Sequence, residues 1–228
     1  MVVNQIVRVI ERAPRDIVDA FKFLPAANIA DAIGKPCPYT LDPGIKSGFE
    51  GAKLVGSAVT VKESSDCNLM SHAAIDLIQN GDVLVIDAGG YIGTAVGGFL
   101  MSRKMISKGC KGVVVDGGWR DKKEVSDAKF PVFTRAWTPG GPHKDVPGSV
   151  NVPVTIGGVL VNPGDIIVGD DDGVVVVPRG KAAEILESGM KISSREEETI
   201  SEERKSEIEK PSPYASEDRL SKMGVVFR

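Results

Sequence analysis

The chain has 228 residues, of which 42% are hydrophobic and 26% charged, and this composition excludes a chain that is disordered throughout. Its 28 Lys and Arg residues nearly balance 31 Asp and Glu residues, for a formal net charge of -3. Because no excess of cations is available to neutralise a phosphate backbone, we expect no nucleic-acid partner. The 26 glycines beside only 5% aromatic residues indicate tight turns and close approaches of the backbone.

Cysteine usage and hydropathy point to a compartment. The cysteines Cys37, Cys67 and Cys110 are too few and too scattered for a disulfide scaffold or a zinc site. The first dozen residues carry charge and have no long apolar core, which argues against a secretory signal. Apolar runs stay far below the ~20 residues that span a bilayer. We therefore expect a cytoplasmic protein without a membrane segment.

The first third of the chain predicts short helices and a strand. Apolar spacing and proline positions predict helices at 15–21 and 26–33, a long loop at 36–50 punctuated by prolines, an alternating strand at 51–62 and a helix at 68–79.

The centre of the chain predicts a strand, a helix and a second strand. Asp82–Asp87 is a continuous apolar run that is too short for a helix and is bounded by glycines, as in a strand buried on both faces. Residues 94–108 have helical spacing, and Lys111–Gly118 forms a second buried strand. Such a unit usually makes a parallel pair with a right-handed crossover.

The last third predicts a β layer followed by a polar arm. Residues 122–128 read as a helix, and short β runs follow at 131–134, 150–156, 158–161, 166–168 and 173–177. Residues 193–210 are almost wholly charged and polar, which is typical of a solvated helix or one that reaches another subunit. A short helix at 214–222 precedes the apolar end Gly224–Arg228, which we expect to dock on a partner surface.

Glycine-rich turns at the carboxyl ends of the two central strands are the strongest candidate site, because ligands collect at such ends. Residues 87–93 lack the GxGxxG spacing, so a small anion is favoured over a dinucleotide. After the second strand, Arg120 and Asp121 follow a double glycine. This pair suits a guanidinium on a carboxylate or enolate beside a hard cation such as Mg²⁺. It equally suits a surface ion pair that caps the next helix.

Other polar residues carry weaker signals. His72 lies on a predicted helix and is interpreted as a satisfied structural histidine, whereas His143 lies in a loop that could line a site entrance. The acidic run at 170–172 lacks the rest of a calcium-binding loop, so a turn between strands is favoured.

Several motifs in one order resemble the RraA-like family, which contains the class II 4-hydroxy-4-methyl-2-oxoglutarate / 4-carboxy-4-hydroxy-2-oxoadipate aldolases. The resemblance covers roughly residues 25–180 and rests on these segments: 81–87, 95–98, 109–121, 151–154, 157–159, 163–165 and 170–178. The polar arm with its Gly-Val-Val-Phe tail is similar to the longer aldolases rather than to the shorter RraA regulators of ribonuclease E.

The resemblance implies an α/β fold, an αββα sandwich of the swivelling β/β/α type with a C-terminal helical arm. The aldolase domain would occupy residues 1–180, and residues 181–228 would form an inter-subunit arm and tail. Trimers or hexamers with sites between subunits are implied as well.

The resemblance also implies roles for individual residues. Asp121 matches the metal-ligating Asp, for Mg²⁺ or Mn²⁺, and Arg120 matches the Arg that binds the pyruvyl group and stabilises its enolate. The helix start that holds the pyruvate carboxylate through backbone N–H groups corresponds to Gly98, Phe99, Leu100 and Met101.

One position departs from the family's pattern. Phe99 stands where the aldolases carry an acidic residue, 21 positions before the Arg, so the proton-transfer step lacks its usual carboxylate. A glutamate from a neighbouring subunit is implied in the family, and Glu196, Glu197 and Glu198 are candidates, of which Glu197 is taken as the acid/base residue.

These observations predict a divalent-metal-dependent lyase that cleaves 4-hydroxy-2-oxo acids to pyruvate through an enolate, with oxaloacetate decarboxylation as a second activity. Two alternatives follow from Phe99. One is a non-catalytic regulatory or binding protein on the same scaffold, and the other is a lyase or hydratase with a different substrate.

Overall fold

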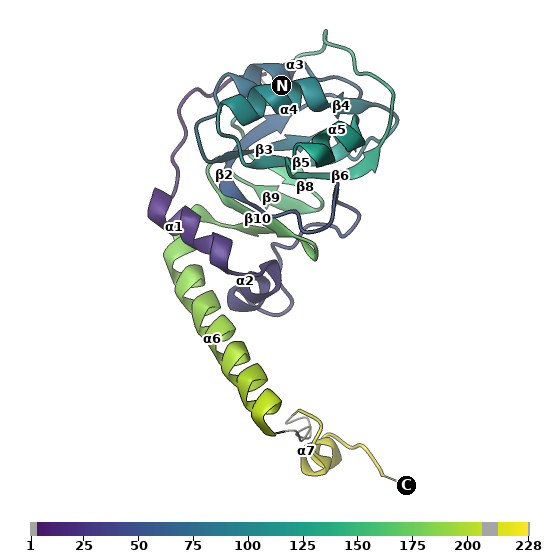
Figure 1. Ribbon diagram of the computed structural model, residues 1–228. Coiled ribbons are helices and arrows are strands. Elements are labelled where there is room, and N and C mark those ends of the chain that lie inside the picture. Colours follow the sequence, from purple (N-terminus) through teal and green to yellow (C-terminus); the bar gives the residue numbers. More distant parts are fainter. Residues whose placement is uncertain (1–3, 207–213, 228) are drawn as a thin grey trace. The chain divides into compact units, whose positions relative to one another are not determined.

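A computed structural model describes residues 4–206 and 214–227 of the chain, and Figure 1 shows its helices and strands. The helices are α1 (Arg15–Ala20), α2 (Ala26–Ile33), α3 (Leu69–Ile75), α4 (Phe99–Ser107), α5 (Lys122–Asp127), α6 (Ala182–Ser206) and α7 (Glu217–Lys222), with 3-10 turns at Phe21–Phe23 and Arg179–Lys181. The strands are β1 (Lys46–Ser47), β2 (Leu54–Lys62), β3 (Asp82–Asp87), β4 (Ala95–Gly97), β5 (Gly112–Trp119), β6 (Val132–Trp137), β7 (Ser149–Val150), β8 (Val154–Ile156), β9 (Val159–Val161), β10 (Ile166–Asp170) and β11 (Gly173–Val177).

One mixed sheet organises the fold, with the strand order β1-β6-β5-β3-β2-β10-β11. Strands β2, β3, β5 and β6 are parallel to one another, whereas β1 pairs antiparallel with β6, and β10 and β11 continue the sheet antiparallel beyond β2. The predicted parallel pair is confirmed, since β3 and β5 run in register from Val83 opposite Gly112 to Asp87 opposite Asp116. Their carboxyl ends therefore meet at one edge of the sheet.

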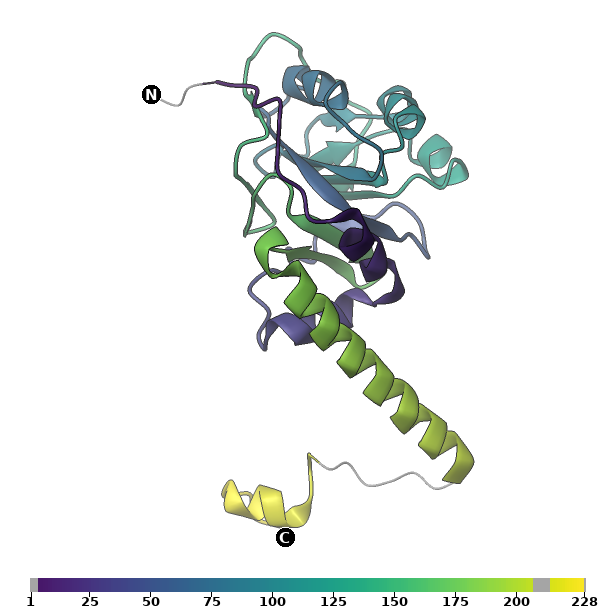
Figure 2. The same ribbon diagram turned by 90° about the vertical axis from the view of Figure 1, so that its left-hand side faces the viewer.

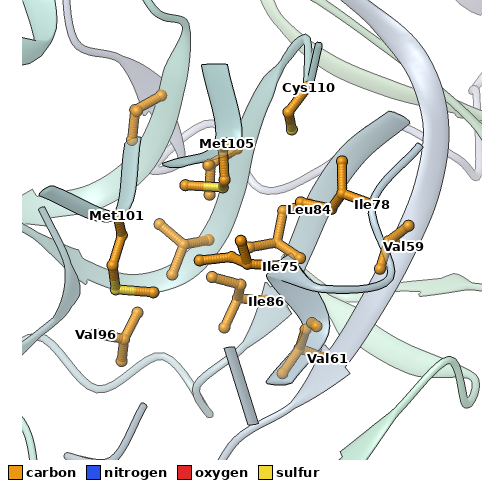
Figure 3. Close-up of a cluster of buried hydrophobic side chains, with 14 of the residues drawn as sticks. Val59, Val61, Ile75, Ile78, Leu84, Ile86, Val96, Met101, Met105 and Cys110 are labelled. Atoms are coloured by element: carbon orange, nitrogen blue, oxygen red, sulfur yellow. The ribbon is translucent and has the colours of Figure 1, made fainter. Parts of the chain in front are cut away.

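The alternation of side chains along each strand produces the layers. In β3, Leu84 and Ile86 lie in the cluster that includes residues of α3 and α4 (Figure 3), whereas Val85 faces a second, inner cluster. In β10, Ile167 contributes to that inner cluster, while Val168 packs in a third cluster with residues of α1 and α2. The sheet thus curves around the inner cluster, so that two β layers lie between the two groups of helices, and the expected αββα sandwich of the RraA-like type is confirmed (Figure 2).

The prediction of one helix over 94–108 is wrong at its start. Residues Ala95–Gly97 form strand β4, which pairs with the end of β5, and the helix begins only at Phe99. Consecutive glycines at 97 and 98 disfavour a helix, and the extended backbone places Gly97 directly under the ring of Trp119, where a Cβ would lie 2.2 Å from the ring.

Two other boundaries differ from the sequence pattern. Helix α3 ends at Ile75 instead of continuing to residue 79, because Leu77 and Ile78 donate to carbonyls three residues back and tighten the chain into a turn. The expected run at 150–156 is two strands, β7 and β8. Asn151 separates them with a φ of 57°, a left-handed conformation that ends an extended segment.

The chain divides into one compact unit up to Met190 and a second unit from Lys191. Ala182 and Ile185, in the first turns of α6, belong to the cluster with α1 and α2. The predicted polar helix is the later part of α6, and the predicted residues 207–210 lie outside the described residues. The boundary that we expect between residues 180 and 181 stays a prediction.

The second unit ends in α7, which confirms a helix within the predicted range 214–222. Val225, Val226 and Phe227 follow it and are exposed, at 45%, 77% and 50%, and their docking on a partner stays a prediction. Within the described residues, every helix is too short or too polar to cross a lipid bilayer.

Candidate active site

The carboxyl end of β5 delivers Arg120 to the edge where β3, β4 and β5 meet. Trp119, the last residue of β5, is fully buried, and its carbonyl accepts the N–H of Thr138 at 2.9 Å. The N–H of Arg120 donates to the carbonyl of Gly97 at 3.1 Å. The backbone of Arg120 is therefore fixed from the β4 side, while its side chain stays 43% exposed.

Asp121 occupies a left-handed backbone conformation, with φ of 60° and ψ of 45°. Asp tolerates this conformation better than most residues, although it costs about 1–2 kcal/mol. Its carboxylate does not cap the following helix α5. Instead, Oδ2 accepts the N–H of Phe99 at 2.8 Å, at the start of α4. The expected capping of the next helix by the Asp121 side chain is therefore wrong, although Arg120 and Asp121 do form an exposed pair.

Gly98 leaves the space in which these two side chains lie. A Cβ at this position would be 2.5 Å from Oδ2 of Asp121 and 2.8 Å from Cγ of Arg120. The Nε of Arg120 is 3.8 Å from Oδ2 of Asp121, and the two side chains are 43% and 37% exposed. An ion pair as exposed as this contributes little to stability, so both groups are available to a ligand.

A cavity of about 290 Å³ opens beside this pair. Its wall is formed by Asn68, His72, Ala95, Gly97, Gly98, Leu100, Met101, Arg120, Asp121, Gly141, Pro142 and Lys144. The side chains that can carry positive charge outnumber the single carboxylate of Asp121, which favours an anionic ligand. The size lies at the lower end of the range for small-molecule sites.

The structure brings together most of the residues that the sequence singled out. Gly98, Leu100, Met101, Arg120 and Asp121 all lie on the wall of this cavity. Phe99 does not, because its ring is partly buried against the core cluster, and only its N–H reaches the site.

Glu197 belongs to α6, in the second unit of the chain, and its side chain is exposed. Its expected acid/base role stays a prediction.

Three polar side chains on the wall were missed as site residues: those of Asn68, His72 and Lys144. Asn68 is 4% exposed, its Nδ2 contacts Sδ of Met101 at 3.5 Å, and its Oδ1 has no hydrogen-bond partner in the described protein. The spacing of four residues between Asn68 and His72 was the available signal, since it places both on one face of a helix.

His72 was interpreted as a satisfied structural histidine, and this does not hold. Its imidazole makes no hydrogen bond to any described residue, and it lines the cavity. Burial, followed by the nearby cations Lys104 and Lys144, lowers the pKa of His72 below its ordinary value of 6.5. The imidazole is therefore mainly neutral at pH 7.

His143 is absent from the wall, although its neighbours Pro142 and Lys144 contribute to it. Its backbone has a positional role instead, since its carbonyl accepts the N–H of Asn68 at 3.1 Å. The acidic run at 170–172 is a turn, as expected: Asp170 accepts the N–H of Ala26 at 2.8 Å and that of Asp172 at 3.1 Å.

The residues present fit a divalent cation held through a single carboxylate. Among the described residues, no three His, Cys, Asp or Glu side chains gather to enclose a metal. The contacts of the Asp121 carboxylate with Phe99 and Arg120 both use Oδ2, so Oδ1 is left for a ligand. Mg²⁺ commonly binds through one or two carboxylates and keeps several waters. An open site with one carboxylate is compatible with this coordination.

Fold and site together define an α/β sandwich protein with a cavity beside Arg120 and Asp121, at the carboxyl ends of parallel strands. Comparison with known proteins identifies the family. Residues 26–176 match the model of the RraA-like family, described as Aldolase/RraA. The chain belongs to the RraA-like family.

Relatives and solved structures agree with this assignment. A protein of Halalkalibacterium halodurans, provisionally named 4-hydroxy-4-methyl-2-oxoglutarate aldolase, is 36% identical over 82% of this chain and 88% of its own length. The 4-hydroxy-4-methyl-2-oxoglutarate aldolase of Thermus thermophilus is 33% identical over 60% of this chain and 83% of its own. The structure of Streptomyces coelicolor RraAS2, titled an unusual member of the RNase ES inhibitor RraA family, is similar with a TM-score of 0.75 and 32% identity, over 84% of this chain and 100% of that one.

Proposed function

We propose that this protein is a divalent-metal-dependent lyase that cleaves 4-hydroxy-2-oxo acids to pyruvate, with decarboxylation of oxaloacetate as a second activity. The observation that carries the proposal is the placement of Arg120 and Asp121 against the glycine-lined start of α4, on the wall of a cationic cavity. The aldolase names of the relatives support the same reaction class.

The start of α4 supplies the site for the substrate carboxylate. The first N–H groups of a helix have no intrahelical partner and carry partial positive charge. The N–H of Phe99 already donates to Asp121, which leaves the N–H groups of Leu100 and Met101 for the carboxylate of the 2-oxo acid. The substrate is then oriented with its 2-oxo group toward the neighbouring side chain of Arg120.

Arg120 stabilises the charge that develops during bond cleavage. When the bond between C3 and C4 breaks, its electrons move into an enolate whose oxygen faces the guanidinium. Because the guanidinium gains its strongest interaction as that oxygen becomes negative, it lowers the barrier rather than only binding the substrate. Loss of carbon dioxide from oxaloacetate produces the same enolate, so the same group assists both reactions.

Asp121 would hold the divalent cation, Mg²⁺ or Mn²⁺, through its carboxylate. When bound, such a cation acts as a Lewis acid that polarises the 2-oxo group. The contact of Oδ2 with the N–H of Phe99 fixes the carboxylate relative to the helix start. Asp121 thereby orients the metal site and the carboxylate site with respect to each other.

Pyruvate release from 4-hydroxy-4-methyl-2-oxoglutarate and from oxaloacetate tests the proposal, with Mg²⁺, with Mn²⁺ and with EDTA. We expect metal-dependent release that falls at least 100-fold in Asp121→Asn. Asp127→Asn, which changes an exposed carboxylate on the following helix paired with Lys123, is the matched control and should keep wild-type rates. Absence of metal-dependent release from both substrates would refute the proposal. Sedimentation of the same samples tests the expected trimer or hexamer.

The regulatory alternative is favoured by Phe99 and by the structural similarity to an RNase ES inhibitor family member. It predicts no turnover of either 2-oxo acid together with capture of ribonuclease E in a pull-down. Turnover without capture would instead support the lyase.

A further inference from the structure

We infer that His72 is the group that transfers the proton in this site, in place of the carboxylate that Phe99 cannot supply. This inference rests on the proposed function and adds a catalytic residue to it. The ring of Phe99 packs against the core, so position 99 offers no titratable group. A proton must nevertheless leave the 4-hydroxyl group and reach C3 in each turnover.

The geometry singles out His72 among the groups on the cavity wall. It lies on α3, one helical turn after the buried Asn68, and both face the cavity that holds Gly98, Arg120 and Asp121. A second cavity of about 520 Å³ is also lined by His72, together with Leu100, Met101, Arg103, Lys104 and Ser107. His72 therefore borders both cavities and is not part of a packed interior.

The charged groups around His72 favour its neutral form. Lys104 and Arg103 approach from α4, Lys144 from the loop before β7, and Arg120 and Asp121 from the end of β5. Helix α3 itself carries no other titratable side chain, and Asp76 only follows its end. Burial and the two lysines lower the pKa of His72. At neutral pH the imidazole has a free nitrogen lone pair, as a general base requires.

The remaining titratable groups on the wall are poor substitutes. Arg120 does not lose its proton in proteins, and Asp121 accepts from the N–H of Phe99 and is the carboxylate assigned to the cation under the proposed function. The ammonium group of Lys144 offers only donors, so it can attract the substrate but cannot accept from a hydroxyl group. His72 is thus the one side chain on this described wall that can both take and return a proton near pH 7.

The proposed step balances as follows. The neutral imidazole of His72 removes the proton of the 4-hydroxyl group, the bond between C3 and C4 breaks, and C4 becomes a carbonyl carbon. The electron pair of the broken bond forms the enolate of pyruvate, and the imidazolium then donates its proton to C3. The imidazole is regenerated, and no redox partner or other co-reactant is needed.

The test compares His72→Gln with His143→Gln, which changes the chain's other histidine, absent from the cavity wall. General acid–base catalysis contributes about 10²–10⁴-fold, so we expect kcat for aldol cleavage to fall at least 100-fold in His72→Gln. Decarboxylation of oxaloacetate forms the enolate without removing a hydroxyl proton and should fall less. The ratio of the two activities should therefore shift at least tenfold, and His143→Gln should keep the wild-type ratio.

The pH profile and chemical rescue separate catalysis from a structural effect. Wild-type aldol cleavage should decline as the pH falls through a pKa below 6.5, and this limb should disappear in His72→Gln. Added imidazole should partly restore cleavage in His72→Ala, provided that circular dichroism shows the variant folded. If His72→Ala is unfolded, the ratio and the pH profile of folded His72→Gln decide the question.

The outcomes are distinguishable. A wild-type protein that releases no pyruvate from either substrate refutes the proposed function and this inference with it. An active wild-type protein with an unchanged activity ratio in His72→Gln refutes the inference alone. Loss of the acid limb in Glu197→Gln instead of His72→Gln would assign the proton to the polar arm and also overturn the inference.

Discussion

The replacement of Gly98 by alanine should damage the site and spare the fold. The backbone at Gly98 is extended, with φ of -164°, so alanine introduces no backbone strain. The added Cβ would lie 2.5 Å from Oδ2 of Asp121, about 0.9 Å short of an ordinary contact at 3.4 Å. The carboxylate must therefore move by nearly 1 Å and weaken its hydrogen bond to the N–H of Phe99.

A displacement of about 1 Å in a positioning group costs about 100-fold in rate, or about 2.7 kcal/mol of transition-state stabilisation. We expect kcat/KM for pyruvate release to fall by that factor in Gly98→Ala. Because the side chains of Arg120 and Asp121 are partly exposed and can change rotamer, the free energy of unfolding should change by less than about 1 kcal/mol. Denaturant titration checks this second expectation.

Two neighbouring glycines serve as controls for Gly98. Gly141→Ala would place its Cβ 3.4 Å from Nη1 of Arg120, an ordinary contact, and should keep the wild-type rate. Gly97→Ala would place its Cβ 2.2 Å from the fully buried ring of Trp119 and should mainly lower stability. Wild-type kcat/KM in Gly98→Ala, within a factor of three, would refute the argument that this glycine shapes the site.

Three further predictions concern stability and thiol chemistry. Arg12 donates two hydrogen bonds of 2.8 Å to the buried carboxylate of Asp82, so Arg12→Ala should cost about 2 kcal/mol and lower Tm by about 4–8 °C in calorimetry. Burial raises the pKa of Cys110 to about 11, so a thiol reagent at pH 8 should modify the half-buried Cys37 long before Cys110. Burial also raises the pKa of Glu63 above 4.5. The folded state then holds the Glu63 proton to higher pH than the unfolded chain, so stability declines as pH rises through that folded pKa. Glu63→Gln should flatten this decline in Tm.

The sequence predicts the layered core well, because the apolar runs that form its central strands are unbroken. The runs at 82–87 and 112–118 are apolar on both faces, and a strand with two buried faces must lie inside a sandwich. The ends of helices and strands are predicted less accurately, since they depend on contacts with distant segments. Gly97 and Gly98 disfavour a helix locally, but the strand at Ala95–Gly97 depends on its pairing with β5, which the local sequence does not specify.

The site is predicted only in part, because some of its residues follow a strand end and others come from distant segments. Arg120 and Asp121 follow a strand end, and a strand end is a local signal. His72 and Lys144 belong to the site only because the loop that contains Pro142 runs past the start of α3 and α4. Two segments about 70 residues apart meet there through backbone bonds such as that from Asn68 to the carbonyl of His143, and side-chain identity does not predict such bonds.

The high glycine content reflects positions where other groups approach the backbone closely. Gly97 and Gly98 are adjacent but respond to different neighbours: Gly97 lies under the ring of Trp119, and Gly98 lies under the carboxylate of Asp121. The first contact concerns packing, and the second concerns only the ligand site. Trp119 ends β5 and Asp121 follows two residues later, so one pair of adjacent glycines serves both the fold and the site. A substitution at either position therefore separates stability from activity, and no motif comparison makes that distinction.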